Sequence, residues 1–138
     1  MGRIIGIDYG DSRIGLALSD LNKIIASPFQ TIPNQGTSDL KVFLKKIVNQ
    51  KEVEYFVLGL PIGLKGQDTN QTRKVRLFGE FLKSLGLPVF YQDERLSSIS
   101  AKNSLIKQNI KTGKNKHMID ERAAAIILQQ FLDINRLK

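Results

Sequence analysis

The chain has 138 residues, of which 41% are hydrophobic and 25% are charged, a composition typical of one compact globular domain. A formal net charge of +8 favours a polyanionic partner such as nucleic acid, although many small basic proteins are simply soluble. The lack of cysteine excludes disulfides and thiolate metal sites, the single histidine excludes a histidine-rich zinc site, and no apolar run approaches the roughly 20 residues that cross a bilayer.

The first part of the chain is rich in predicted strands. Residues 3–8 are apolar and β-branched and run into an Asp-Tyr-Gly-Asp turn, which predicts a strand that ends at Asp8. Residues 14–18 and 24–32 predict two further strands, so the chain opens as an antiparallel meander. The apolar spacing then changes to that of a helix over residues 40–48.

The rest of the chain alternates strands and helices. Residues 55–60 are almost continuously apolar, as expected for a strand that is buried on both faces, and residues 61–71 predict a loop. A helix with its apolar face over residues 75–85 should follow, ended by glycine and proline. The remaining predicted elements are a strand over 89–91, a helix capped by Ser97 or Ser98 that reaches about residue 108, a basic segment over 109–116 and a last helix over 119–135.

This order of elements predicts the fold class. Strands that alternate with helices after an antiparallel start indicate an α/β fold, in which a central mixed five-stranded sheet is flanked by helices. No internal repeat or low-complexity tract divides the chain, so residues 1–138 are expected to form a single domain. We expect this domain to be soluble and cytoplasmic, with no membrane partner.

Three carboxylates occupy positions that call for a chemical explanation. Asp8 and Glu94 each follow a predicted strand, at the carboxyl end where open α/β sheets bind ligands. Asp120 shares one helical face with alanine and aliphatic residues, and a carboxylate that points into a protein is costly unless it is paired or binds a cation. Each has a plainer alternative: a turn around Asp8, an exposed ion pair of Glu94 with Arg95, and a helix cap at Asp120.

Taken together, the three carboxylates predict one metal-dependent site. Oxygen ligands without thiolates suit Mg²⁺ or Mn²⁺. Two such ions about 4 Å apart assist phosphodiester hydrolysis by activating water and stabilising the departing oxygen. We therefore expect Asp8, Glu94 and Asp120 to be both the catalytic residues and the metal ligands of a nuclease.

Basic residues near these carboxylates are candidates for binding the nucleic-acid backbone. Lys111, Lys114 and Lys116 lie in one short segment, while Arg13 and Arg95 lie close in sequence to two of the acids. Such side chains hold phosphates without reading bases. Taken singly, each lysine is more typical of solvated surface, and the clustering is what favours a binding role.

Several motifs follow one another over nearly the whole chain: Ile5-Gly-Ile-Asp8-Tyr-Gly, Arg13-Ile-Gly-Leu-Ala-Leu-Ser-Asp20, Val57-Leu-Gly-Leu-Pro61 with Gly66, Asp93-Glu94-Arg95-Leu-Ser, and Lys116 with Ile119-Asp120, Ala123-Ala124 and Ile127-Leu128. In these motifs the chain resembles the YqgF/RuvX family, Holliday junction resolvases also assigned to pre-16S rRNA processing. The resemblance implies an RNase-H-like fold, a cytoplasmic nuclease, and an acidic site at Asp8, Glu94 and Asp120.

His117 is a possible auxiliary residue. It precedes Asp120 by one helical turn, and the segment His117-Met-Ile-Asp120 is similar to the His-x-x-Asp ending of RuvC resolvases. A histidine there can ligate a metal or carry a proton, although a polar surface residue is the plainer interpretation.

Several functions stay open. The leading hypothesis is an endonuclease that processes the 5′ end of pre-16S rRNA, and the alternative is a resolvase of branched DNA, for which a homodimer would pair two active sites. A non-catalytic nucleic-acid-binding assembly factor is a third, although three acids would weaken phosphate binding. The Asp8-x-Gly turn also resembles the phosphate loop of actin-like ATPases and sugar kinases, which need two lobes where this chain has length for one.

Overall fold

The computed structural model describes residues 2–94 and 116–136, for 116–119 and 136 the backbone alone. The helix predicted to end near residue 108 and residues 109–115 of the predicted basic segment lie outside these residues, whereas Lys116 begins a helix. The described elements are β1 (Arg3–Tyr9), β2 (Arg13–Ser19), β3 (Ala26–Pro33), α1 (Thr37–Lys51), β4 (Val53–Leu60), α2 (Asn70–Lys83), β5 (Val89–Asp93) and α4 (Lys116–Arg136).

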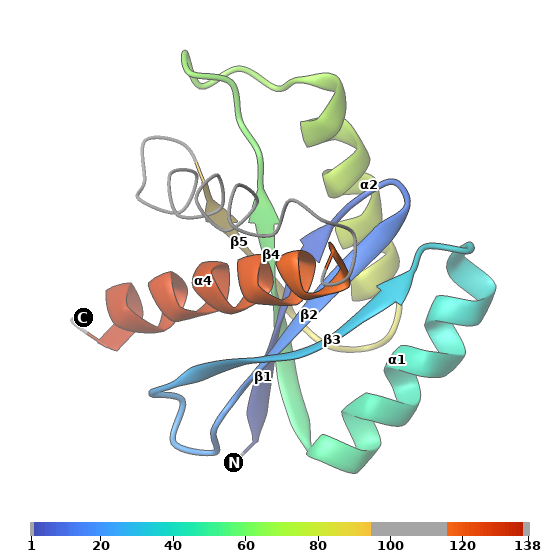
Figure 1. Ribbon diagram of the computed structural model, residues 1–138, viewed down its shortest axis with the longest axis vertical. Helices are drawn as coiled ribbons and strands as arrows, with labels where there is room; N and C mark the ends of the chain where they lie inside the picture. Colours follow the sequence, from blue (N-terminus) through green and yellow to red (C-terminus); the bar gives the residue numbers. More distant parts are fainter. Residues whose placement is uncertain (1, 95–115, 137–138) are drawn as a thin grey trace.

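The strands form one five-stranded sheet in the order β3-β2-β1-β4-β5 (Figure 1). β1 and β3 pair antiparallel with β2, and β4 pairs parallel with both β1 and β5. The predicted mixed sheet with an antiparallel start is therefore confirmed. Because β1, β4 and β5 run in the same direction, their last residues, Tyr9, Leu60 and Asp93, mark one end of the sheet, which we call the carboxyl end.

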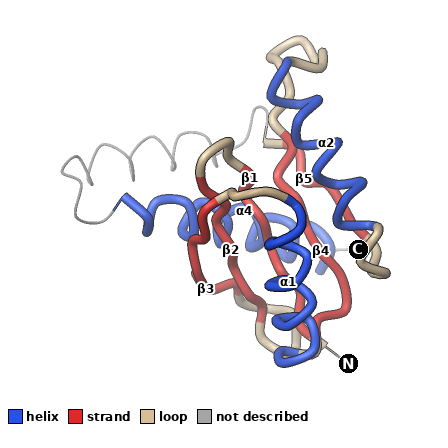
Figure 2. The backbone as a smooth tube through the Cα atoms, turned by 90° about the vertical axis from the view of Figure 1, so that its right-hand side faces the viewer, coloured by secondary structure: helices blue, strands red, loops and turns tan. Residues whose placement is uncertain are grey.

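Helices cover the two faces of the sheet (Figures 1 and 2). The larger core lies between the sheet and the first two helices, to which Leu44 of α1 and Leu82 of α2 contribute fully buried side chains. The smaller core lies under α4, where Ile127 and Leu128 are equally buried. The apolar face predicted for the last helix is thus the face that packs on the sheet.

Glycines let α4 lie unusually close to the strands. A Cβ atom added to Gly6 of β1 would stand 2.6 Å from the Cβ of Leu128, and one added to Gly15 of β2 would overlap the backbone of Asp120. No larger residue fits at either position without moving the helix. The start of α4 is therefore held directly against the sheet.

The loop after β4 is shorter than predicted. The sequence prediction extended it to residue 71, but α2 begins at Asn70 because Thr69 caps the helix: its side-chain oxygen accepts a hydrogen bond from the Thr72 backbone N–H, and the Thr72 side chain accepts one from the Thr69 N–H. Within the described part of the chain, no helix is long and apolar enough to span a membrane.

Candidate active site

Asp8 lies at the carboxyl end of the sheet, on the face that α4 covers. Side chains alternate along a strand, so Asp8 shares its face with Ile4 and Gly6, and both of these contact the α4 side. The β1–β2 register places Asp8 directly opposite Gly15. The half-buried carboxylate is therefore next to the position where α4 crosses the sheet.

Asp120 reaches the same place from α4. Its backbone lies over Gly15, the residue paired with Asp8, so that the helix turn and the end of β1 are neighbours across one glycine. The helix begins at Lys116, four residues earlier, so the alternative that Asp120 caps the helix is wrong.

Glu94 completes the acidic residues at this end. It follows the last residue of β5, and its backbone N–H donates to the carbonyl of Leu60 at 3.3 Å. A Cβ added to Gly59 would stand 3.2 Å from Oε2 of Glu94 and 2.6 Å from Cδ1 of Ile127, so the carboxylate lies over β4 on the α4 side. The three predicted site residues therefore share one face and one end of the sheet.

Arg13 forms an ion pair with one of these acids. Its Nε donates to Oδ2 of Asp120 at 2.8 Å, although 107 residues separate the two in the chain. The side chain of Asp120 is 19% exposed and that of Arg13 is 47% exposed, so solvent screens the pair in part. The guanidinium that was expected to contact substrate phosphate thus first contacts an acid of the site.

The three carboxylates are chemically suited to bind a hard cation, but their side chains are not arranged closely enough to share one. Carboxylate oxygens are the ligands that Mg²⁺ and Mn²⁺ prefer. Among the described side chains, however, no three acidic or histidine groups are gathered closely enough to hold a metal ion, and Asp120 faces Arg13. Binding of a divalent cation by all three acids would require Asp120 to exchange its guanidinium partner for the ion, so the shared metal site stays a prediction.

Most of the predicted basic residues lie outside the part of the chain that the structure describes. Arg95, Lys111 and Lys114 fall outside the described residues. Lys116 and His117 belong to the first turn of α4, but their side chains are not among those described, so their proposed roles stay predictions.

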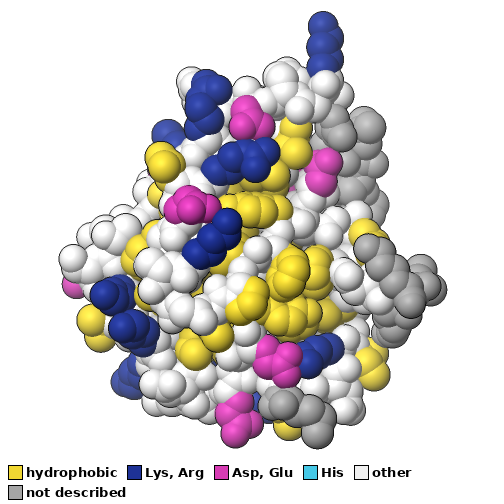
Figure 3. All heavy atoms as spheres, turned by 180° about the vertical axis from the view of Figure 1, so that it is seen from behind, with side chains coloured by type: hydrophobic (Ala, Val, Ile, Leu, Met, Phe, Trp, Pro, Cys, Tyr) yellow, Lys and Arg dark blue, Asp and Glu magenta, His cyan; other side chains and the backbone are white. Residues whose placement is uncertain are grey.

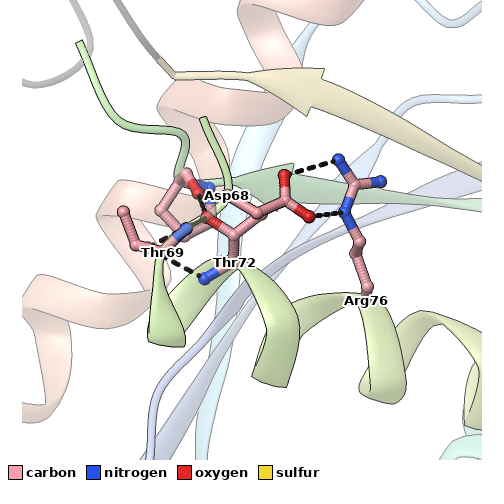
Figure 4. Close-up of polar contacts among 5 residues, drawn as sticks. Asp68, Thr69, Thr72 and Arg76 are labelled. Atoms are coloured by element: carbon pink, nitrogen blue, oxygen red, sulfur yellow. Dashed lines mark hydrogen bonds and ion pairs between the residues drawn. The ribbon is translucent and has the colours of Figure 1, made fainter. Parts of the chain in front are cut away.

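The loop between β4 and α2 adjoins Glu94, although the sequence prediction gave this loop no role in the site. Residues 61–69 leave β4 immediately after Leu60 and enter α2 (Figure 1). Figure 4 shows how its second half is attached to α2: Thr72 and Thr69 are joined side chain to side chain, and the Asp68 carboxylate meets the Arg76 guanidinium. The one signal in the sequence is the three-residue spacing of the two threonines, which is typical of a helix cap.

Comparisons with known proteins agree with this architecture. The RuvX family, described as Holliday junction resolvase, matches residues 2–134. A protein from Dictyoglomus thermophilum is 39% identical over 136 residues, 98% of either chain, and one from Trichormus variabilis is 41% identical over 133 residues, 96% of this chain and 88% of its own. Both are provisionally named pre-16S rRNA nucleases.

A solved structure resembles the chain in fold. RuvC of T. thermophilus, in complex with a Holliday junction substrate, matches with a TM-score of 0.59 at 12% identity, over 99% of this chain and 96% of its own. At that identity the likeness concerns the fold alone. It confirms the predicted RNase-H-like α/β fold.

Proposed function

Because the chain belongs to the RuvX family of Holliday junction resolvases, we propose that it is a nuclease that hydrolyses phosphodiester bonds of structured nucleic acid at the carboxyl end of its sheet. The observation that supports this most strongly is the crossing of α4 over Gly15, opposite Asp8, which makes two acids from distant parts of the chain neighbours. The names of the curated relatives favour the 5′ end of pre-16S rRNA as substrate, and hence a cytoplasmic role in ribosome biogenesis.

In this proposal Asp8, Glu94 and Asp120 are the catalytic residues and would hold Mg²⁺ or Mn²⁺. Such ions, when bound, supply charge stabilisation for the oxygens of the reacting phosphate. The protein fixes its own groups in advance: Asp8 belongs to a strand paired on both sides, the backbone of Glu94 is hydrogen-bonded to Leu60, and Asp120 is carried by a helix whose apolar face is buried against the sheet. Rigid placement of this kind lowers the cost of ordering the reactants.

Arg13 has a second role in the proposal. A guanidinium carries donors on three nitrogens, and here Nε serves Asp120. The terminal nitrogens suit a substrate phosphate, which would accept hydrogen bonds beside the acidic residues. Arg13 would then link the substrate backbone to the position of Asp120.

The acidic site is tested by comparing two aspartates that lie three residues apart, Asp8 at the end of β1 and Asp11 in the turn that follows. Asp8→Asn is expected to abolish cleavage of a pre-16S rRNA 5′ leader in Mn²⁺ while binding of the leader stays within about twofold of wild type, because binding depends on the basic residues. Asp11→Asn is the matched control, since Asp11 is 60% exposed and pairs with Lys74 at 3.3 Å. Cleavage by Asp8→Asn at the wild-type rate would refute the assignment.

Four-way DNA junctions are the second candidate substrate, favoured by the description of the family. A junction has two-fold symmetry, so resolution would require a homodimer that presents two acidic sites. Incubation of the protein with matched RNA leaders and DNA junctions in Mn²⁺, followed by mapping of the cuts, separates the two. Symmetric nicks in junctions would select the resolvase, cuts confined to the leader would select the RNA nuclease, and tight binding without cuts would indicate a non-catalytic assembly factor.

A further inference from the structure

The turn of residues 63–67, which we call the β4–α2 turn, carries a conspicuous pair of side chains. Leu64 is 81% exposed, the highest value among the large apolar residues that the structure describes, and Lys65 beside it is exposed as well. In the described part of the chain, no ion pair involves Lys65. A single exposed leucine needs no explanation by itself, so the case depends on how and where this pair is held.

The turn is stiffened by its own hydrogen bonds. The Gly63 N–H donates to the carbonyl of Gln67 at 2.9 Å, and the Gly66 N–H donates to the carbonyl of Gly63 at 2.8 Å. The Gln67 side chain also accepts from the Lys65 N–H at 3.0 Å. Gly66 has φ +85°, a value that L side chains rarely adopt. The backbone of the pair is therefore defined before any ligand binds.

The base of the turn is fixed to α2 (Figure 4). Thr72 is fully buried and its hydroxyl donates to the carbonyl of Pro61, the first residue after β4. On the other side of the turn, Arg76 donates from Nε and a terminal nitrogen to the two oxygens of Asp68, at 3.0 and 3.2 Å. Both ends of the projecting turn are thus attached to α2. These attachments restrict the conformations of the turn, so that less entropy is lost when its tip binds a ligand.

The base of the turn lies at the carboxyl end of the sheet, and the tip projects beyond it (Figure 1). Pro61 follows Leu60, whose carbonyl accepts the backbone N–H of Glu94, so the turn departs from the strand end beside one proposed catalytic residue. β4 also lies between β1, which carries Asp8, and β5, which Glu94 follows. On the face that α1 and α2 cover, acidic and basic side chains lie interspersed (Figure 3).

We propose that Leu64 and Lys65 contact the nucleic-acid substrate, with the Lys65 ammonium on a backbone phosphate and Leu64 against the face of an unpaired base near the cleaved bond. A lysine positions nucleic acid through phosphate, and apolar side chains of proteins insert against unstacked bases. The two adjacent residues would together recognise a site where paired and unpaired nucleotides meet. This inference rests on the proposed nuclease function and deepens it.

Binding measurements in EDTA, where cleavage cannot interfere, test the lysine. One phosphate contact changes log K by about 0.7 to 0.9 for each tenfold change in salt, or about five- to eightfold in affinity at 0.1 M salt. Lys65→Ala should therefore weaken binding of a pre-16S leader hairpin by about that factor and reduce the salt slope by about the same 0.7 to 0.9. Lys46→Ala, which removes an exposed lysine from α1, is the control and should change neither quantity.

The leucine is tested with two RNAs that differ in pairing. Leu64→Ala should lower the affinity for the hairpin with unpaired bases by about threefold or more, leave the affinity for a fully paired duplex of the same sequence unchanged, and leave the salt slope unaltered. Val42→Ala on α1 is the control, because Val42 is also a highly exposed aliphatic residue, at 71%, and lies on a different element.

If Leu64→Ala and Lys65→Ala bind both RNAs like wild type, or lose no more affinity than the α1 controls, the inference is overturned while the nuclease proposal stands on its cleavage result. If the wild-type protein cuts neither leader nor junction but the two variants show the expected losses, the contact surface is supported and the nuclease proposal fails.

Discussion

The Arg13–Asp120 ion pair gives one carboxylate of the proposed site a cationic partner from within the protein. Asp8 and Glu94 reach the same face by another route, through the ends of two strands. Carboxylates that lie near one another repel unless a positive charge intervenes. A guanidinium at Asp120 supplies part of that charge, and it competes with any divalent cation for the same oxygens.

This competition predicts an effect on metal affinity. Arg13→Gln should bind Mn²⁺ more tightly than wild type, by about two- to tenfold, because it removes a positive charge from a partly exposed position close to the ion. Titration of Mn²⁺ followed by electron paramagnetic resonance, without nucleic acid, measures the difference. Lys74→Gln makes the same change in net charge at the Asp11 pair and serves as control. Unchanged or weaker Mn²⁺ binding by Arg13→Gln would show that the guanidinium does not compete for Asp120.

At the scale of elements, the contact between α4 and the sheet determines where Asp120 lies. The helical period of the sequence predicts which face of α4 is buried, and the alanines there are indeed packed on the sheet. It does not reveal that the helix backbone meets Gly15, because that contact joins residues over 100 positions apart and involves no side chain of β2. The attachment of the β4–α2 turn joins residues only 8 and 11 positions apart, Asp68 with Arg76 and Pro61 with Thr72, but these contacts depend on how the loop folds back on α2 and follow no helical or strand period.

The close crossing can be disturbed at a single residue. Gly15→Ala is expected to lower the free energy of unfolding by about 1–3 kcal/mol, because the added methyl group would overlap the Asp120 carbonyl and push α4 away from β2. Urea denaturation measures the loss, and cleavage should fall further than stability alone explains, since Asp120 moves with the helix. A variant with wild-type stability and activity would mean that α4 does not depend on this contact.

For the whole molecule, the sequence was sufficient to predict the sheet, its mixed character and the strand ends that bear Asp8 and Glu94. Strands of β-branched residues and the alternation of strands with helices are local patterns, and the parallel order follows from the topology of α/β folds. The partner of Asp120 could not be predicted, because Arg13 was equally suited to substrate phosphate. Whether Arg13 contacts Asp120 or a substrate phosphate depends on the distance between Arg13 and Asp120 in the folded chain, and the sequence does not give that distance.

The central claim is that Asp8, Glu94 and Asp120 work as one site, and its most direct test is the additivity of their losses. Single-turnover cleavage of the pre-16S rRNA leader in Mn²⁺ would be measured for Asp8→Asn, Glu94→Gln, Asp120→Asn and their pairwise combinations. When residues act as a unit, removing one already removes the contribution of the others. Each single substitution should therefore slow cleavage by at least about a hundredfold. Each double variant should be no slower than the slower of its two single variants. Single variants that cleave at the wild-type rate, or losses that multiply in the doubles, would contradict a shared site.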